Sequence, residues 1–126
     1  MSALLDSDVL IDYLRGQPAA VTLLETELTE ACLSAVSVAE LYQGVREGRE
    51  RSQLAELVAA FTVLPVTVEI AAQAGLFSRS YRASHGCNLA DCLIAATAEV
   101  HQLPLLTLNR KHYPMLKNAR IPYQKT

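Results

Sequence analysis

The chain opens with MSALLDSDVLIDYLRG, residues 1–16, and this stretch indicates how the rest of the chain folds. The apolar run Ser2–Leu5 has the length of a short buried strand and ends in Asp6. Ser7 is placed to cap a helix that runs to about Leu14. A buried strand followed at once by a helix is the first unit of a parallel α/β fold.

The same alternation of strand and helix continues along the chain. Ser37 and Glu40 have the S-x-x-E form of a capping box, which starts a helix. The further strands are expected over Ala31–Ala35, Val63–Val66, Leu105–Leu108 and Ala119–Tyr123, with Pro65 favouring an edge position for the second of these. The further helices are expected to open at Pro18 and to include Leu54–Phe61, Ile70–Tyr81 and Asn88–Val100. We therefore expect one α/β domain over residues 1–126, with a central, mainly parallel sheet between two layers of helices.

Length and composition bound the class of protein. The chain has 126 residues, which is the size of one domain, and 51% of them are hydrophobic, which excludes a disordered chain. No apolar run reaches the ~18–20 residues needed to span a bilayer, and the acidic start is unlike a secretory signal. None of the three cysteines lies in a CxxC motif, so zinc knuckles have no support. These features predict a cytoplasmic protein that does not associate with a membrane.

Charge is distributed unevenly along the chain. Residues 1–45 carry seven acids and one base, whereas residues 109–126 carry five bases and no acid. An acidic front and a basic tail suit a site that holds a cation and a polyanion together, although ordinary surface charge would give the same count.

Polar side chains follow the predicted strands. Asp6 follows the first strand, Glu40 lies in the first turn of the helix after the second, and Asp91 lies near the start of the helix over residues 88–100. Asn109 follows a later strand, and in a parallel sheet all four meet at one edge. Three carboxylates would repel one another, and Mg²⁺ or Mn²⁺ removes that conflict. Such an ion activates water, so the pattern predicts hydrolysis of a phosphodiester bond.

Each of these residues also has a purely structural interpretation. Asp6 is a turn acid beside Ser7, and Glu40 completes a capping box with Ser37. Asp91 is an N3 acid favoured by the helix dipole, and Asn109 is a turn or capping residue. Asp8 and Asp12 are interpreted as solvated positions of the first helix.

Four segments together point to a known family. They are LLDSDVLIDYLRG (4–16), LSAVSVAELYQGV (33–45), NLADCLIAATA (88–98) and LLTLNRKHYP (105–114). Their order and spacing resemble those of PIN-domain ribonucleases of the VapC toxin type, and the resemblance covers nearly the whole chain.

The resemblance implies an endoribonuclease with a PIN-like fold and an acidic cluster that binds Mg²⁺ or Mn²⁺. At the matching positions, Asp6 and Asp91 would be the main metal ligands, and Glu40 would be a ligand or would orient the water. Ser7 falls on the family's small hydroxyl position. In such toxins the substrate is often a loop of tRNA or rRNA.

The chain departs from the family at the fourth acidic position, which falls on the neutral Asn109. Many relatives also carry an aspartate before an aromatic residue, where this chain has His112 before Tyr113. We expect weaker or differently placed binding of a second metal. His112 either transfers a proton or touches phosphate, or is a surface or capping residue.

The resemblance also implies partners. A VapB-type antitoxin would wrap the toxin and insert a basic residue among the carboxylates, giving a heteromeric complex with a toxin homodimer. The RNA phosphates would contact basic residues. Candidates are Arg110, Lys111, Lys117 and Arg120, with Arg46, Arg49 and Arg51 as a second cluster.

Two other functions remain open at this stage. The neutral Asn109 leaves room for a catalytically silent PIN-like module that binds RNA or antitoxin. Asp6-Ser-Asp8 after a strand is also the pattern of an Asp-x-Asp phosphatase with Asp6 as nucleophile, for which Lys111 is only a loose candidate partner.

Overall fold

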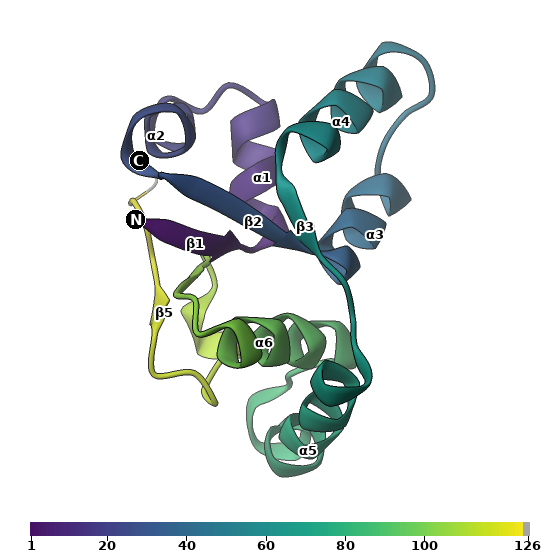
Figure 1. Ribbon diagram of the computed structural model, residues 1–126, viewed down its shortest axis with the longest axis vertical. Helices are drawn as coiled ribbons and strands as arrows, with labels where there is room; N and C mark the ends of the chain where they lie inside the picture. Colours follow the sequence, from purple (N-terminus) through teal and green to yellow (C-terminus); the bar gives the residue numbers. More distant parts are fainter. Residues whose placement is uncertain (125–126) are drawn as a thin grey trace.

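The computed structural model describes residues 1–124 apart from the side chain of His85, and in this part of the chain five strands form one sheet in the order β3-β2-β1-β4-β5 (Figure 1). Every pairing in the sheet is parallel. The strands are β1 (Ser2–Leu5), β2 (Glu30–Ser34), β3 (Thr62–Leu64), β4 (Leu105–Leu106) and β5 (Ala119–Arg120). The prediction of a parallel central sheet is confirmed, and β3 occupies the edge that Pro65 indicated.

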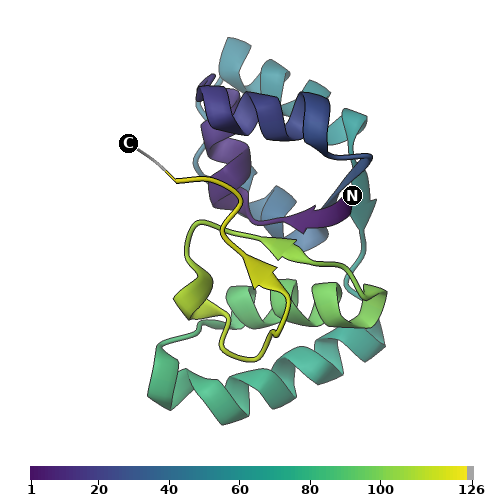
Figure 2. The same cartoon turned by 90° about the vertical axis from the view of Figure 1, so that its left-hand side faces the viewer.

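Helices cover both faces of the sheet (Figures 1 and 2). One layer contains α1 (Ser7–Leu14), α2 (Pro18–Thr22), α3 (Ala35–Gln43) and α4 (Arg49–Ala60), and a π-helical turn η1 (Leu23–Glu27) extends α2. The other layer contains α5 (Val68–His85) and α6 (Leu89–His101). A 3-10 turn, η2 (Arg110–His112), follows β4. No helix within residues 1–124 is long and apolar enough to cross a bilayer.

Strand β1 is the centre of the core. Because side chains alternate along a strand, Ala3 and Leu5 face the cluster formed with α1, α3 and α4, whereas Leu4 faces Ile94 and Ala95 of α6. Ala3, Leu4 and Leu5 are fully buried. The strand is therefore apolar throughout, as expected for a strand covered on both faces.

The strand order reverses between β1 and β4. From β1 the chain moves outward through β2 and β3, and it then returns to place β4 on the other edge of β1. Ligands of such sheets bind outside the carboxyl ends of the strands at this reversal. Asp6 directly follows β1 and Thr107 directly follows β4, and the Asp6 amide donates to the Leu106 carbonyl at 2.9 Å. The fold thus places these two polar residues side by side.

Two helix starts differ from the sequence prediction. The N-cap of α1 is Asp6 rather than Ser7, because the Asp6 side chain accepts a hydrogen bond from the Ser7 amide at 2.8 Å. The N-cap of α3 is Ser34, whose hydroxyl accepts from the Val36 amide at 3.1 Å. The capping box predicted for Ser37 and Glu40 is wrong, because β2 passes directly into α3 and Ser37 lies inside the helix.

The two serines give opposite expectations for stability. Ser34→Ala removes the cap of α3 and should lower the free energy of unfolding by about 1 kcal/mol. Ser37→Ala should leave it unchanged or raise it slightly, because the buried Ser37 hydroxyl has no hydrogen-bond partner among residues 1–124. Urea denaturation of both variants and the unmodified protein measures the difference. A larger loss of unfolding free energy for Ser37→Ala than for Ser34→Ala would support the capping box predicted for Ser37 and Glu40.

Candidate functional site

Asp6 lies at the junction of β1 and α1, and donors hold both of its carboxylate oxygens. Oδ1 accepts from the Ser7 amide at 2.8 Å. Oδ2 accepts from the Thr107 hydroxyl at 2.8 Å and from the Tyr113 hydroxyl at 2.9 Å. The side chain is only 8% exposed, so these bonds compensate a nearly buried carboxylate.

Asp91 is the N3 residue of α6 and serves its cap as well. The Asp91 amide donates to Asn88 Oδ1 at 2.8 Å, and the Asn88 amide donates to Asp91 Oδ2 at 3.4 Å. Asp91 Oδ1 lies 3.5 Å from the Tyr113 hydroxyl, which also contacts Asp6. The capping interpretation of Asp91 and its place beside Asp6 are therefore both correct.

Glu40 lies in the second turn of α3 rather than the first, since the helix begins at Ala35. Its Oε1 accepts from the Ser7 hydroxyl at 3.3 Å. Burial, then the charges of Asp6 and Asp91, raise the pKa of Glu40. Burial, and to a smaller extent Asp6, raises the pKa of Asp91, against the opposing effects of the Asn88 amide and His112. Asp6, Glu40 and Asp91 therefore act on one another as one group, here called the acidic cluster.

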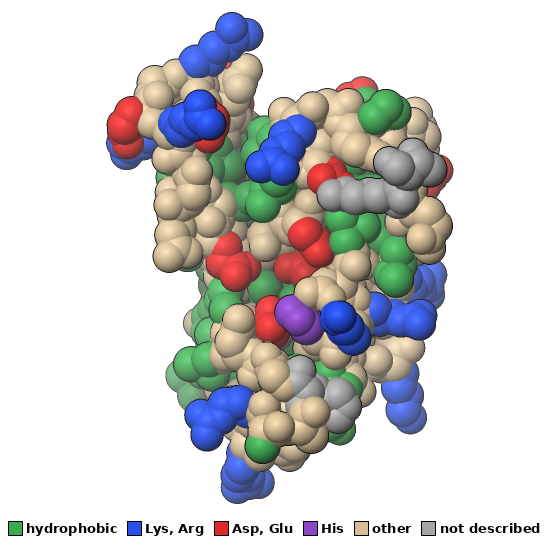
Figure 3. All heavy atoms as spheres, turned by 180° about the vertical axis from the view of Figure 1, so that it is seen from behind, with side chains coloured by type: hydrophobic (Ala, Val, Ile, Leu, Met, Phe, Trp, Pro, Cys, Tyr) green, Lys and Arg blue, Asp and Glu red, His purple; other side chains and the backbone are tan. Residues whose placement is uncertain are grey.

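The acidic cluster opens onto one face of the molecule. Figure 3 shows acidic side chains gathered at the centre of this face, with a histidine beside them and basic side chains further out. His112 Nδ1 lies 3.7 Å from Asp91 Oδ2, and the two form an ion pair only when the imidazole is protonated. The cluster thus carries an excess of negative charge.

Asp8 and Asp12 are not solvated, contrary to the sequence prediction. Asp8 Oδ2 accepts from the Leu108 amide at 3.0 Å, while Oδ1 is buried without a hydrogen-bond partner in the described residues. Burial, and then the charge of Asp6, raises the pKa of Asp8 to about 6. Asp12 is 5% exposed and accepts from the Tyr123 hydroxyl at 2.8 Å. The returning C-terminal segment, roughly 100 residues further along the chain, covers both aspartates.

Asn109 reaches the acidic cluster indirectly. Its amide donates to the Thr107 hydroxyl at 3.0 Å, and its Nδ2 lies 3.0 Å from His112 Nδ1. It precedes η2 and makes no side-chain cap there, so it is a turn residue that orients His112. The side chain of His112 is 39% exposed at the edge of the cluster.

Sequence reasoning did not identify two residues of the site, Thr107 and Tyr113. Thr107 is fully buried and Tyr113 is 2% exposed. Burial, then the charges of Asp6 and Asp91, raise the pKa of Tyr113, so its hydroxyl remains protonated. A signal for Thr107 was present, because a lone polar residue in the apolar run Leu105–Leu108 needs a buried partner.

The donor set of the acidic cluster suits a hard divalent cation. Carboxylate oxygens are the ligands that Mg²⁺ and Mn²⁺ prefer, and Mg²⁺ keeps several waters while binding one or two carboxylates directly. Among the side chains that the structure describes, no group of three or more His, Cys, Asp or Glu is arranged to hold a metal ion. Asp6 and Asp91 contact the same Tyr113 hydroxyl, so the cluster offers the two carboxylates that Mg²⁺ binds directly while it keeps its waters.

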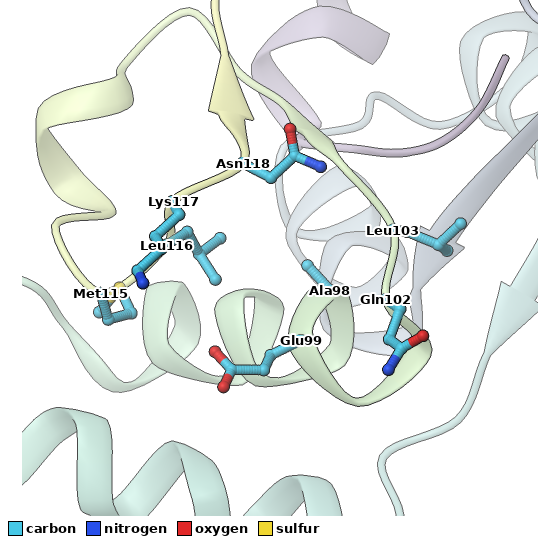
Figure 4. Close-up of a pocket in the computed structure, with 8 residues that line it drawn as sticks. All are labelled: Ala98, Glu99, Gln102, Leu103, Met115, Leu116, Lys117 and Asn118. Carbon is cyan, nitrogen blue, oxygen red and sulfur yellow. The ribbon is translucent and has the colours of Figure 1, made fainter.

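Two hollows lie beside the helices. A groove of about 470 Å³ runs between α1, α3 and α4, and Glu40 joins it to the acidic cluster. A second hollow, of about 430 Å³, lies between the end of α6 and Met115–Asn118 (Figure 4). Its lining includes Glu99 and Lys117 but no residue of the acidic cluster.

The sheet is parallel, and carboxylates gather where its strand order reverses. These two features place the chain among the α/β proteins with an acidic site at the carboxyl edge of the sheet. The family model described as "PIN domain" matches residues 3–116, so the chain belongs to the PIN domain family.

Known proteins narrow the assignment within this family. Ribonuclease VapC10 from Mycobacterium tuberculosis is 46% identical over 123 residues, covering 95% of this chain and 92% of that protein. The crystal structure of FitAcB from Neisseria gonorrhoeae is 33% identical with a TM-score of 0.71, covering 90% of this chain and 91% of that one. A toxin–antitoxin complex from Klebsiella pneumoniae, at 24% identity, shares the fold with a TM-score of 0.84 over 98% of this chain and 99% of that one. Within the family, the chain is a VapC-type ribonuclease, the toxin of a type II toxin–antitoxin system, which confirms the resemblance and disfavours the phosphatase and silent-module alternatives.

Asp8 should make stability depend on pH in the absence of metal. Its pKa is raised from 3.8 to about 6 by folding, so the folded state favours the protonated form, and the stabilisation present below pH 3.8 is lost as pH rises through about 6. Asp8→Asn should remove this loss. Between pH 4 and 7 the free energy of unfolding of the variant should therefore rise by about 1 kcal/mol relative to that of the unmodified protein, after allowance for solvent screening.

Chemical denaturation in EDTA at a series of pH values measures this difference. Glu99→Gln, which removes an exposed acid on α6, is the control and should run parallel to the unmodified protein. A parallel profile for Asp8→Asn would contradict the assignment of a raised pKa to Asp8.

Proposed function

We propose that the protein is a metal-dependent endoribonuclease that hydrolyses RNA phosphodiester bonds at the acidic cluster, and that residues 1–126 form one PIN domain. One observation carries this proposal. Asp6 and Asp91, which are far apart in the sequence, contact the same buried hydroxyl at the reversal of strand order, and Glu40 lies beside them. Such a concentration of carboxylates is stabilised by a cation.

In this proposal Asp6 and Asp91 hold Mg²⁺ or Mn²⁺, and Glu40 is a further ligand or orients the attacking water. When bound, the ion polarises a phosphoryl oxygen and lowers the pKa of a bound water. The Ser7 hydroxyl donates to Glu40 and so fixes the direction of that carboxylate. The raised pKa of Glu40 suits a group that accepts a proton during hydrolysis.

The turn after β4 supplies the groups that meet the RNA. His112 lies at the edge of the acidic cluster, where it is placed to touch a phosphate, and Asn109 orients it. Arg110 and Lys111 are exposed on the same turn and suit the neighbouring phosphates. We propose that the substrate is a loop of tRNA or rRNA, read by shape and backbone because the chain has few aromatic residues. Of the basic residues in the tail, Lys125 lies outside the described residues.

The same negative charge suits a protein partner. We propose a VapB-type antitoxin that places a guanidinium against the acidic cluster and so competes with the metal ion. This partner follows from the VapC-type assignment, and one solved structure with the same fold is a toxin–antitoxin complex. A toxin homodimer within that complex is part of the proposal.

Removal of either main carboxylate should abolish cleavage. Asp6→Asn and Asp91→Asn keep an oxygen for the Ser7 and Asn88 amides but lose the negative charge. Each should lower the rate of RNA cleavage in Mg²⁺ or Mn²⁺ by at least about 100-fold. EDTA should stop cleavage by the unmodified protein, and added Mn²⁺ should restore it.

Glu99→Gln is the matched control, because it removes one acid from an exposed site beside the second hollow. It should cleave RNA at the rate of the unmodified protein. Cleavage by Asp6→Asn and Asp91→Asn at the rate of this control would show that the acidic cluster is not the active site.

A further inference from the structure

We infer that Tyr113 is a positioning residue that holds Asp6 and Asp91 at the separation needed to bind a divalent cation. The inference rests on the proposed metal-dependent activity and assigns a role to a side chain outside the acidic cluster. Tyr113 directly follows η2. It therefore comes from a different segment of the chain than Asp6, which follows β1, and Asp91, which lies in α6.

Core side chains hold the Tyr113 ring in place. It packs in the core cluster with Leu4, Ile94 and Leu105, and only 2% of the residue is exposed. Its hydroxyl donates to Asp6 Oδ2 at 2.9 Å and lies 3.5 Å from Asp91 Oδ1. The ring is therefore held in the core, and its hydroxyl reaches the two carboxylates.

The other contacts fix each carboxylate separately. Thr107 and Ser7 donate to Asp6, and Asn88 caps Asp91. Among the side chains that the structure describes, the Tyr113 hydroxyl is the hydrogen-bonding group that contacts both carboxylates. Without this hydroxyl, mutual repulsion favours separation of the Asp6 and Asp91 carboxylates. A binding cation must then bring them together again, which lowers its affinity.

The chain offers a matched pair of variants for a test. Tyr113→Phe keeps the packed ring and removes only the hydroxyl. Tyr123→Phe removes a similar hydroxyl, which donates to the buried Asp12 at 2.8 Å but belongs to the opposite core cluster. Both variants lose one bond to an aspartate, so a general loss of stability should affect both.

The experiment titrates Mn²⁺ alone, without RNA, and follows free Mn²⁺ by electron paramagnetic resonance well below the melting temperature. Tyr113→Phe should weaken Mn²⁺ binding by about tenfold, the scale of one hydrogen bond to a charged group. Tyr123→Phe should bind within twofold of the unmodified protein. In RNA cleavage, Tyr113→Phe should need about tenfold more Mn²⁺ for half of the maximal rate and should approach the normal rate at saturation.

Three results would overturn the inference. Binding of Mn²⁺ by Tyr113→Phe as tightly as by the unmodified protein, or more tightly, would show that the hydroxyl does not organise the site. Equal weakening in Tyr123→Phe would indicate a general loosening of the fold. Failure of the unmodified protein itself to bind Mn²⁺ would remove the proposed metal dependence and this inference together, and that result is distinct from the other two.

Discussion

The parallel pairing of β1 on both of its edges determines where the acidic cluster lies. β2 and β4 lie on either side of β1, and helices cover both faces, so polar groups can reach this strand only at its ends. Its C-terminal end lies where the strand order reverses. The first residue beyond that end is Asp6, and the fold brings Asp91 and Glu40 to the same place.

A group of carboxylates that are buried or partly buried is costly, and the structure offsets this cost with hydrogen bonds to neutral donors. Asp6 receives an amide and two hydroxyls, and Glu40 receives the Ser7 hydroxyl. Neutral donors stabilise the carboxylates without cancelling their charge. The acidic cluster consequently keeps its attraction for a cation, which a lysine or arginine in the same place would remove.

Much of the fold was predictable from the sequence because it depends on local signals. The apolar runs Ser2–Leu5 and Ala31–Ala35 predicted the central strands β1 and β2, and the helix predicted from Asn88 matches α6. The cap of α3 was misplaced by three residues, since Ser34 and Ser37 are both acceptable caps and only the end of β2 distinguishes them.

The parts of the site that sequence reasoning missed depend on contacts between distant segments. The burial of Asp8 and Asp12 and the roles of Thr107 and Tyr113 all arise where the C-terminal segment returns across α1 and β1. The hydrogen bond from Tyr113 to Asp6 joins residues 107 positions apart in the chain. During synthesis, a ribosome therefore releases the first strand and its aspartate long before the tyrosine emerges. The acidic cluster therefore lacks its Tyr113 hydrogen bond until 107 further residues have been synthesised after Asp6.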